Sequence, residues 1–432
     1  MTTRHINEYE QSLIDKAKTY LPAGTFGNVT HDIVIREGRG GRVWDHSGNE
    51  YVDFLLGSGP MLIGHAHPKV MEAVLDQIPR GTTFFVNNEN GILLAEAICK
   101  AVACAEKVRF TSSGSEATHY AMRLARAYRG KEKILKFEGG FHGMGDYALM
   151  SMSPKRPGNF PVATPDSAGI PDAVRGEMLI APFNDADAAA DIIRQHRDEL
   201  AGVIVEPFQR LLPPKPGFLE ALREVTAALG IPLIFDEVVT GFRFAYGGAQ
   251  AYYGVTPDVC TLGKVVGGGF PLAAVAGRAD IMKHFDKGAV PEDRYMPQIG
   301  TLSGNPVAAA AGLATLGVLS EPGAYDRLFT TGNRLRSGLK ALIKERGIAA
   351  QVIGEAPLFD LVFTSSEVRD YRGMHSGNAD RMRRLNRALQ AQGILKGESK
   401  YYISLAHDEA DVAKTLAAWS TAFDEISEKA PA

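Results

Sequence analysis

The sequence predicts an α/β fold built around a mostly parallel sheet. From about residue 90 onward, short apolar runs alternate with segments of helical periodicity. This pattern is typical of buried parallel strands joined by helices. The chain has 432 residues, of which 45% are hydrophobic, so we expect more than one packed unit. The predicted strands are residues 107–111, 133–137, 202–205, 232–236 and 259–262.

Other elements are expected on both sides of these strands. Residues 13–20 are predicted to form a short helix with Ser12 as its N-cap. A hairpin is expected at residues 42–54, because two alternating runs flank a turn of polar residues and glycine. Amphipathic periodicity predicts a helix over residues 68–78. Further helices are predicted at residues 92–102 and 115–128, and an alanine-rich one follows residue 306 and runs to residue 319.

Composition excludes several classes of protein. The formal net charge is −3 and 22% of residues are charged, so the chain lacks the basic footprint of a nucleic-acid-binding protein. No apolar stretch approaches the length of a membrane span, and the first ten residues lack the apolar core of a signal peptide. We therefore expect a cytoplasmic protein without nucleic-acid or membrane partners. Cysteines at 99, 104 and 260 show no paired spacing, so no metal site is expected.

Asp236 closes the apolar run 232–235 and is therefore expected at the carboxyl end of a buried strand. Ligands of open α/β sheets bind at this edge. A carboxylate there needs a cationic partner. A helix cap or a structural ion pair remains the alternative for an isolated aspartate.

Lys264 also follows a predicted strand, and the glycine-rich segment 265–271 comes directly after it. A poorly solvated lysine favours its neutral amine, which is the nucleophile that condenses with carbonyl compounds. Glycines permit unusual backbone angles and the close approach of a planar ligand. The alternative is a surface lysine in a loop.

Residues 111–117 join a predicted strand to a predicted helix. Here Ser113, Gly114 and Ser115 place hydroxyl and backbone N–H groups at a helix N-terminus, where phosphate binds well. A plain capping motif is the alternative. The chain lacks the pattern G-x-x-x-x-G-K-[ST] of nucleotide-binding loops.

A lysine nucleophile, a carboxylate and a phosphate cradle together fit the needs of pyridoxal 5′-phosphate (PLP). Beyond this chemistry, the sequence resembles the class III aminotransferases, and within them the glutamate-1-semialdehyde aminomutase branch. The resemblance covers most of the chain. Its matching segments are residues 64–68, 113–117, 141–143, 206–207, 233–243 with 261–264, and 300–306.

The resemblance implies a PLP enzyme of fold type I that works as a homodimer with active sites at the subunit interface. It implies a large domain with a seven-stranded, mostly parallel sheet, and a smaller α+β domain built from both ends of the chain. Residues 71–306 would form the large PLP-binding domain, and residues 1–70 and 307–432 would form the small one.

The same resemblance assigns roles to single residues. Lys264 would be the Schiff-base lysine and proton carrier, and Asp236 would pair with the pyridinium nitrogen. The cofactor ring would lie between Phe141 and Val238. Gly114 and Ser115 would hold the phosphate, together with Thr301 from the neighbouring subunit. Glu206 would orient the cofactor's surroundings, and His142 would be a further cofactor-binding residue, with a structural histidine as its alternative.

Two segments depart from the aminomutase pattern. Thr30 stands where aminomutases have an arginine that holds the substrate carboxylate, and a hydroxyl cannot replace a bidentate guanidinium. Residues 286–298 differ from the short glycine-rich lid of aminomutases. Both departures favour ping-pong transamination between an amine or amino acid donor and a keto acid, ketone or aldehyde acceptor. An aminomutase or another PLP isomerase remains the alternative, and a non-catalytic PLP-binding protein is a third.

Two further residues are candidates for substrate contact. Phe26, in place of a polar residue, indicates an apolar pocket and a donor with a bulky apolar part. Arg243 is a candidate contact for a substrate carboxylate, with a structural ion pair as its alternative.

Overall fold

The computed structural model describes residues 4–27 and 32–427. Its contacts divide the chain into two compact units. The large unit consists of Lys69–Glu321 and Val368–His375. The small unit takes the described residues up to Pro68, Pro322–Glu367, and those from Ser376 onward. The boundaries expected from the sequence were 70/71 and 306/307.

A seven-stranded sheet forms the core of the large unit, in the order β4-β10-β9-β8-β7-β5-β6. All neighbours pair in parallel except β10, which runs antiparallel to both β4 and β9. The α/β fold with a mostly parallel sheet is therefore confirmed. The strands are β4 (Lys107–Thr111), β5 (Lys133–Phe137), β6 (Met178–Ala181), β7 (Leu200–Val205), β8 (Leu233–Glu237), β9 (Val259–Leu262) and β10 (Ala273–Gly277).

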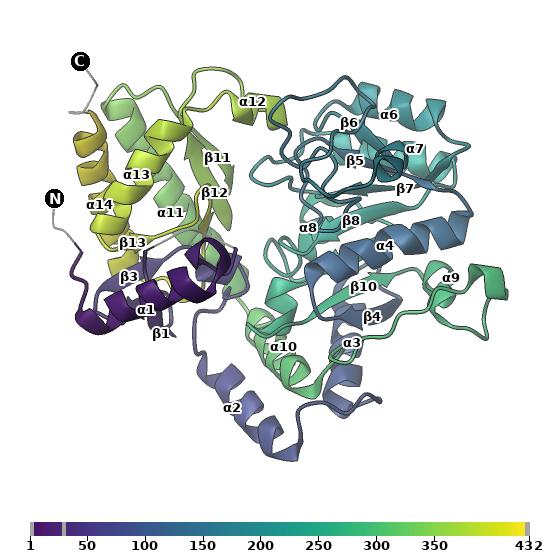
Figure 1. Cartoon of the computed structure of the whole chain (residues 1–432), viewed down its shortest axis with the longest axis horizontal. Coiled ribbons are helices and arrows are strands. Elements are labelled where there is room, and N and C mark those ends of the chain that lie inside the picture. Colours follow the sequence, from purple (N-terminus) through teal and green to yellow (C-terminus); the bar gives the residue numbers. More distant parts are fainter. Residues whose placement is uncertain (1–3, 28–31, 428–432) are drawn as a thin grey trace. The chain divides into compact units, whose positions relative to one another are not determined.

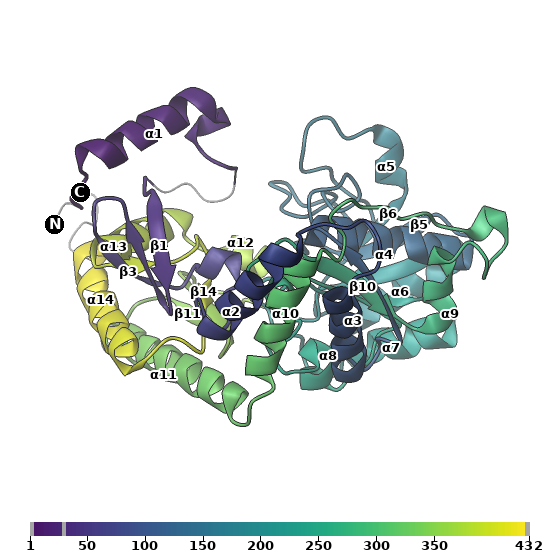
Figure 2. The ribbon, with the colours of Figure 1, turned by 90° about the horizontal axis from the view of Figure 1, so that it is seen from below.

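The helices of the large unit pack on the seven-stranded sheet and on other helices. Helix α4 (Gly114–Arg129) packs on β7, β9 and β10, and Figures 1 and 2 show α3 (Glu89–Ala101) beside α10 (Pro306–Leu319). The other large-unit elements are α2 (Pro68–Gln77), α5 (Asp172–Gly176), α6 (Ala186–Gln195), α7 (Phe218–Ala228), α8 (Gly248–Tyr253), α9 (Ala279–Met282), α12 (Tyr371–His375), and the 3₁₀ turns η3 (Ile78–Arg80), η4 (Lys264–Gly267), η5 (Lys283–Phe285) and η6 (Glu292–Arg294).

Helix α10 explains why the second boundary lies at 321/322. It packs on α3 and on η4, so it belongs to the large unit. The approach to η4 is close enough to require glycine, because a Cβ on Gly312 would lie 2.2 Å from the carbonyl oxygen of Val266. The predicted alanine-rich helix is therefore present, and it supports the segment that begins with Lys264.

A short piece of the C-terminal region also belongs to the large unit. Arg372 on α12 forms a bidentate ion pair with Glu138, with N–O distances of 2.7 and 3.0 Å. The hydroxyl of Tyr371 donates to the carbonyl of Pro154 at 3.1 Å. These bonds fix α12 beside the segment that leads from β5 to Phe141.

The small unit contains two sheets, in the orders β1-β2-β3-β13 and β11-β12-β14. Its hairpin, β2 with β3, is the one predicted. Helix α1 begins at Glu8 rather than Leu13, because Asn7, not Ser12, caps it by accepting from the amide of Glu10 at 2.8 Å. The elements are β1 (Ile35–Arg39), β2 (Arg42–Asp45), β3 (Glu50–Asp53), β11 (Gln351–Glu355), β12 (Leu358–Val362), β13 (Ile394–Leu395), β14 (Tyr401–Tyr402), α1 (Glu8–Tyr20), α11 (Ala324–Glu345), α13 (Ala379–Ala391), α14 (Glu409–Ser427), η1 (Pro22–Gly24) and η2 (Leu56–Ser58).

Within the described part of the chain, no single helix has the length and apolarity to cross a membrane. Helices α10 and α11 together reach the required length and composition only as a broken pair.

Candidate active site

Asp236 lies at the carboxyl end of β8, and both of its carboxylate oxygens are bonded. Oδ1 accepts from the hydroxyl of Thr261 at 2.8 Å and from the amide of Val238 at 3.2 Å. Oδ2 lies 2.8 Å from Nδ1 of His142. The side chain is buried. These contacts fix the orientation of the carboxylate at the sheet edge where ligands of α/β folds bind.

His142 is buried and contacts Asp236 through one ring nitrogen only. A carboxylate next to Nδ1 favours the proton on that nitrogen. Nε2 is also buried and has no hydrogen-bond partner in the described chain. The structure therefore places His142 next to Asp236, where it can orient the carboxylate, rather than in a fully bonded structural position.

Lys264 opens η4 directly after β9 and is half-buried. Its φ of +50° lies in the left-handed region, which non-glycine residues rarely adopt. Val238 packs nearby, against two glycines. A Cβ added to Gly114 would lie 2.8 Å from Cγ1 of Val238, and one added to Gly263 would lie 3.2 Å from it. The end of β8, the end of β9 and the start of α4 therefore meet at Val238.

The start of α4 carries a capping box. The hydroxyl of Ser113 accepts from the amide of Glu116 at 3.2 Å, and the Glu116 carboxylate accepts from the amides of Ser112 and Ser113. The Ser115 hydroxyl instead accepts from the amide of Met144 at 3.2 Å. The amides of Gly114 and Ser115 have no acceptor among the described residues. The capping box therefore leaves the first two amides of α4 open to an acceptor from outside the described chain.

The capping hydrogen bond of Ser113 should contribute measurably to the free energy of unfolding. We expect Ser113→Ala to lower the free energy of unfolding by about 1 kcal/mol, because the amide of Glu116 loses its acceptor. Chemical denaturation of the purified protein measures this change. Ser112→Ala is the matched control, since only the backbone of Ser112 takes part in the box. An equal loss in both variants would contradict the capping role.

Glu206 follows β7 and reaches Phe141. Its Oε2 accepts from the amide of Phe141 at 2.8 Å, and Glu206 itself is buried. The guanidinium carbon of Arg210 lies 5.2 Å from the centre of the Phe141 ring. Phe141, His142, Glu206, Asp236 and Lys264 thus all follow the carboxyl ends of strands in the same sheet.

Lys136 is a residue near this site that the sequence analysis did not identify. It lies on β5, is fully buried, and donates to the carbonyls of Ala148 and Met150, both at 2.7 Å. Burial lowers the pKa of Lys136 to about 7, and the negative charges of Glu206 and Asp236 partly oppose this shift. The one sequence feature that could have indicated this residue is a lysine inside a predicted strand. Its acceptors could not be predicted, because they lie more than ten residues away in the sequence.

The lowered pKa of Lys136 predicts a pH-dependent stability. The folded protein releases this proton near pH 7, whereas the unfolded chain keeps it up to the ordinary value of 10.5. Between these values the unfolded state binds more protons, so the free energy of unfolding rises with pH, by up to about 1.4 kcal/mol per unit. Denaturation at several pH values should show a flatter dependence for Lys136→Met. Parallel curves for the two proteins would contradict the shift.

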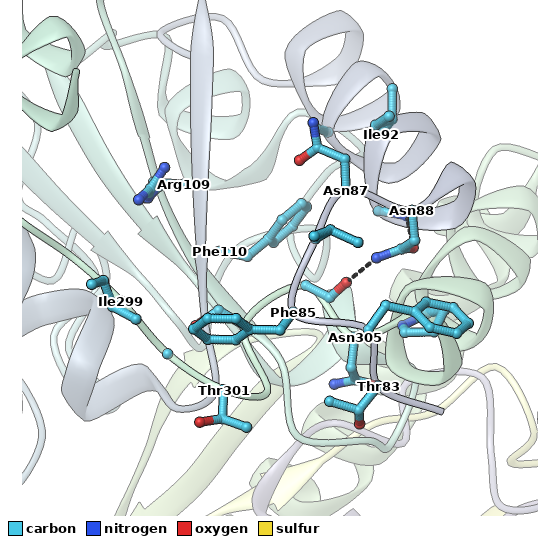
Figure 3. A pocket seen from close by; sticks show the side chains of 18 of the residues that line it. Thr83, Phe85, Asn87, Asn88, Ile92, Arg109, Phe110, Ile299, Thr301 and Asn305 are labelled. Carbon is cyan, nitrogen blue, oxygen red and sulfur yellow. Dashed lines mark hydrogen bonds between the residues drawn. The ribbon is translucent and has the colours of Figure 1, made fainter. Parts of the chain in front are cut away.

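Thr301 lines a cavity on the large unit. The residue is exposed, and the cavity, with a volume of 480 Å³, is shown in Figure 3 with Phe85 and Ile299 around it. In the wall of this cavity, the side-chain amide of Asn88 donates to the carbonyl of Gly304 (Figure 3). Of the residues predicted to contact PLP, Thr301 alone among those described lines this cavity.

The two predicted substrate residues belong to different units. Phe26 belongs to the small unit and is 86% exposed. Arg243 belongs to the large unit and is fully buried. Thr30 lies outside the described residues.

A family model for class III aminotransferases matches residues 25–405. The chain belongs to this family. This class III enzyme is 42% identical over 419 residues to a glutamate-1-semialdehyde 2,1-aminomutase of Methanothermobacter thermautotrophicus, covering 94% of this chain and 97% of the relative. An omega-transaminase from Sphaerobacter thermophilus is 38% identical and has a TM-score of 0.92, over 97% of this chain and 98% of that one. A β-phenylalanine aminotransferase from Variovorax paradoxus is 30% identical, with a TM-score of 0.87 over 98% and 96%.

Class III aminotransferases depend on PLP, and similar structures carry PLP or its amine form, PMP. The residues of this chain fit that cofactor. The lysine amine of Lys264 and the buried carboxylate of Asp236 follow adjacent parallel strands. The amides of Gly114 and Ser115 open a helix, where a phosphate is stabilised.

Proposed function

We propose that the protein is an aminotransferase that moves an amino group between an amine or amino acid donor and a keto acid, ketone or aldehyde acceptor. PLP supplies an electrophilic carbon for the amine and a ring that accepts electrons from the donor carbon. Lys264 is the covalent anchor, and its freed amine carries the proton between the donor and the cofactor. The carboxylate of Asp236 keeps the ring nitrogen protonated, and His142 orients that carboxylate.

The remaining residues position the cofactor in this proposal. Phe141 and Val238 would bound the two faces of the ring, and Glu206 holds the backbone of Phe141. Ser113 caps the start of α4, whose first amides would bind the phosphate. Gly114 and Ser115 supply those amides.

The segment 286–298 supports transamination over isomerisation, because it differs from the short glycine-rich lid of aminomutases. In this chain the segment is bonded to other residues of the large unit. Met296 donates to the carbonyl of His284 at 2.8 Å, Arg294 donates to that of Tyr128 at 3.0 Å, and Gln298 accepts from Arg109 at 2.6 Å.

The aminomutase remains the second candidate, because the relative that is 42% identical is one. Against it stands Thr30, where aminomutases have the arginine that holds the substrate carboxylate.

One experiment separates the two reactions. The purified protein with PLP is mixed with 1-phenylethylamine and then with pyruvate, while the visible absorption of the cofactor is followed. Transamination predicts that the amine bleaches the band as acetophenone forms, and that pyruvate restores it as alanine forms. Conversion of glutamate-1-semialdehyde to its isomer, with no reaction of any amine and pyruvate, would instead establish the aminomutase.

We also infer that the enzyme is a homodimer with its active sites at the subunit interface. The support is an apolar surface next to Thr301: Phe85 is 67% exposed, Val86 74% and Ile299 76%. Patches of this kind on a folded protein usually mark an interface. A second copy covering this surface brings Thr301 to the phosphate of its neighbour.

A charge in this surface should dissociate the dimer. We expect Phe85→Glu to raise the dissociation constant at least about tenfold, because a carboxylate would be buried without a partner. Light scattering over a dilution series measures the effect. Tyr20→Glu, which changes another exposed aromatic residue outside this surface, is the control. A Phe85→Glu protein with the wild-type mass at every concentration would exclude this surface as the interface.

A further inference from the structure

Arg210 places a positive charge beside Phe141 without an acidic partner. Its guanidinium carbon lies 5.2 Å from the ring centre, and its side chain is half-buried. No hydrogen bond or ion pair joins this guanidinium to any residue in 4–27 or 32–427. Arg372 shows the usual alternative: it stacks over Phe160 at 4.6 Å and is also paired with Glu138 through two bonds.

The backbone that carries Arg210 is fixed. The amide of Gln209 donates to the carbonyl of Leu212 at 3.0 Å, and the amide of Leu212 donates to the carbonyl of Gln209 at 2.8 Å. These two bonds form a turn that contains Arg210. The side-chain amide of Gln209 donates to the carbonyl of Glu138 at 2.8 Å. Arg210 itself has φ +60°, in the left-handed region that costs a non-glycine residue free energy. An arginine held there against its backbone preference is a candidate for a functional role.

We propose that Arg210 binds the carboxylate of the substrates, so that the donor is an amino acid and the acceptor a keto acid. This proposal rests on the proposed transamination and names its substrate class. A guanidinium offers a planar pair of donors that matches a carboxylate, and this one lies beside the ring of Phe141, with its carbon 5.2 Å from the ring centre. Arg243, the other candidate, is fully buried, whereas Arg210 is half-buried.

The test uses two donors that differ by one carboxylate. They are 3-amino-3-phenylpropanoate and 1-phenylethylamine, each mixed with the PLP-loaded protein in a single half-reaction. Arg210→Met should raise the half-saturating concentration of the amino acid roughly 10- to 100-fold, the equivalent of one charge-assisted pair. For the amine this concentration should stay within about twofold, because no carboxylate is present. Equal changes for both donors, or for neither, would overturn the proposal.

A binding measurement keeps this test independent of turnover. Calorimetry compares 3-phenylpropanoate with the neutral 3-phenylpropanamide on the PLP-loaded protein. The wild type should prefer the acid, and Arg210→Met should lose that preference. If no donor reacts with the wild type, the aminotransferase proposal fails, but this comparison still decides the role of Arg210: a preference for the acid that survives in the variant would overturn it.

Two further variants test whether an effect of Arg210→Met comes from misfolding rather than from the lost guanidinium. Arg210→Gly removes the side chain and suits the left-handed backbone, so this variant should remain folded and should also lose the preference for the acid. Arg197→Met removes a charge from an exposed arginine elsewhere on the large unit and should change neither binding nor kinetics. If Arg210→Gly keeps the wild-type preference, the carboxylate is bound elsewhere.

Discussion

Replacing Lys264 with alanine is expected to lower kcat by roughly three orders of magnitude or more. The amine is proposed both as the covalent anchor and as the proton carrier, and a positioned proton carrier alone contributes about 10²- to 10⁴-fold. The resting variant should also lack the visible absorption band of the wild type with PLP. Steady-state kinetics and the absorption spectrum of the same preparation measure both effects.

Lys131→Ala is the matched control, because Lys131 is an exposed lysine on the large unit. It should retain the wild-type rate and spectrum. A Lys264→Ala protein with an unchanged absorption band in the absence of amine would refute the assignment of this lysine.

The second large effect is expected for Asp236→Asn, with a fall in kcat of roughly 100-fold or more. The substitution keeps the shape of the side chain but removes the charge that would hold the ring nitrogen protonated, and preorganised charges in such sites contribute about 10²- to 10³-fold. The amide oxygen of asparagine can still accept from Thr261 and from the amide of Val238. The variant should therefore remain folded, and circular dichroism checks this.

Asp198→Asn provides the control for loss of one carboxylate, since the Asp198 side chain is 87% exposed. Its kinetics should match those of the wild type. If Asp236→Asn reacts within about twofold of the wild-type rate, the proposed charge on the ring nitrogen plays no part in the rate-limiting step.

Much of the large-unit sheet could be predicted, because each strand is short, apolar and bounded by polar or glycine residues. Strand β9 begins and ends where the pattern predicted. Strand β10 was missed because its sequence, Ala-Ala-Val-Ala-Gly, consists mostly of residues with a low strand preference, and burial in the sheet decides its conformation. The start of α1 was misplaced because Asn7 caps the helix ahead of its apolar residues.

The candidate site was predictable where the chemistry follows the end of a strand. Asp236 and Lys264 are of this kind, since parallel strands align their carboxyl ends. The surroundings of Lys136, Glu138 and Arg210 were not predictable, because their partners come from distant parts of the chain. The ion pair between Glu138 and Arg372, for example, spans 234 positions.

The contact of Val238 with Gly114 and Gly263 has a consequence for how this enzyme can change. A methyl group at Gly114 would lie 2.8 Å from Cγ1 of Val238, so a substitution of Gly114 is blocked while valine is present; one at Gly263 would lie 3.2 Å from the same atom and would need only a small shift. Evolution toward a different ring-face geometry must therefore shrink position 238 before it enlarges position 114. Related sequences should show positions 114 and 238 varying together. Directed evolution that starts from Val238→Ala should yield active variants with a side chain at position 114, and libraries that keep Val238 should not.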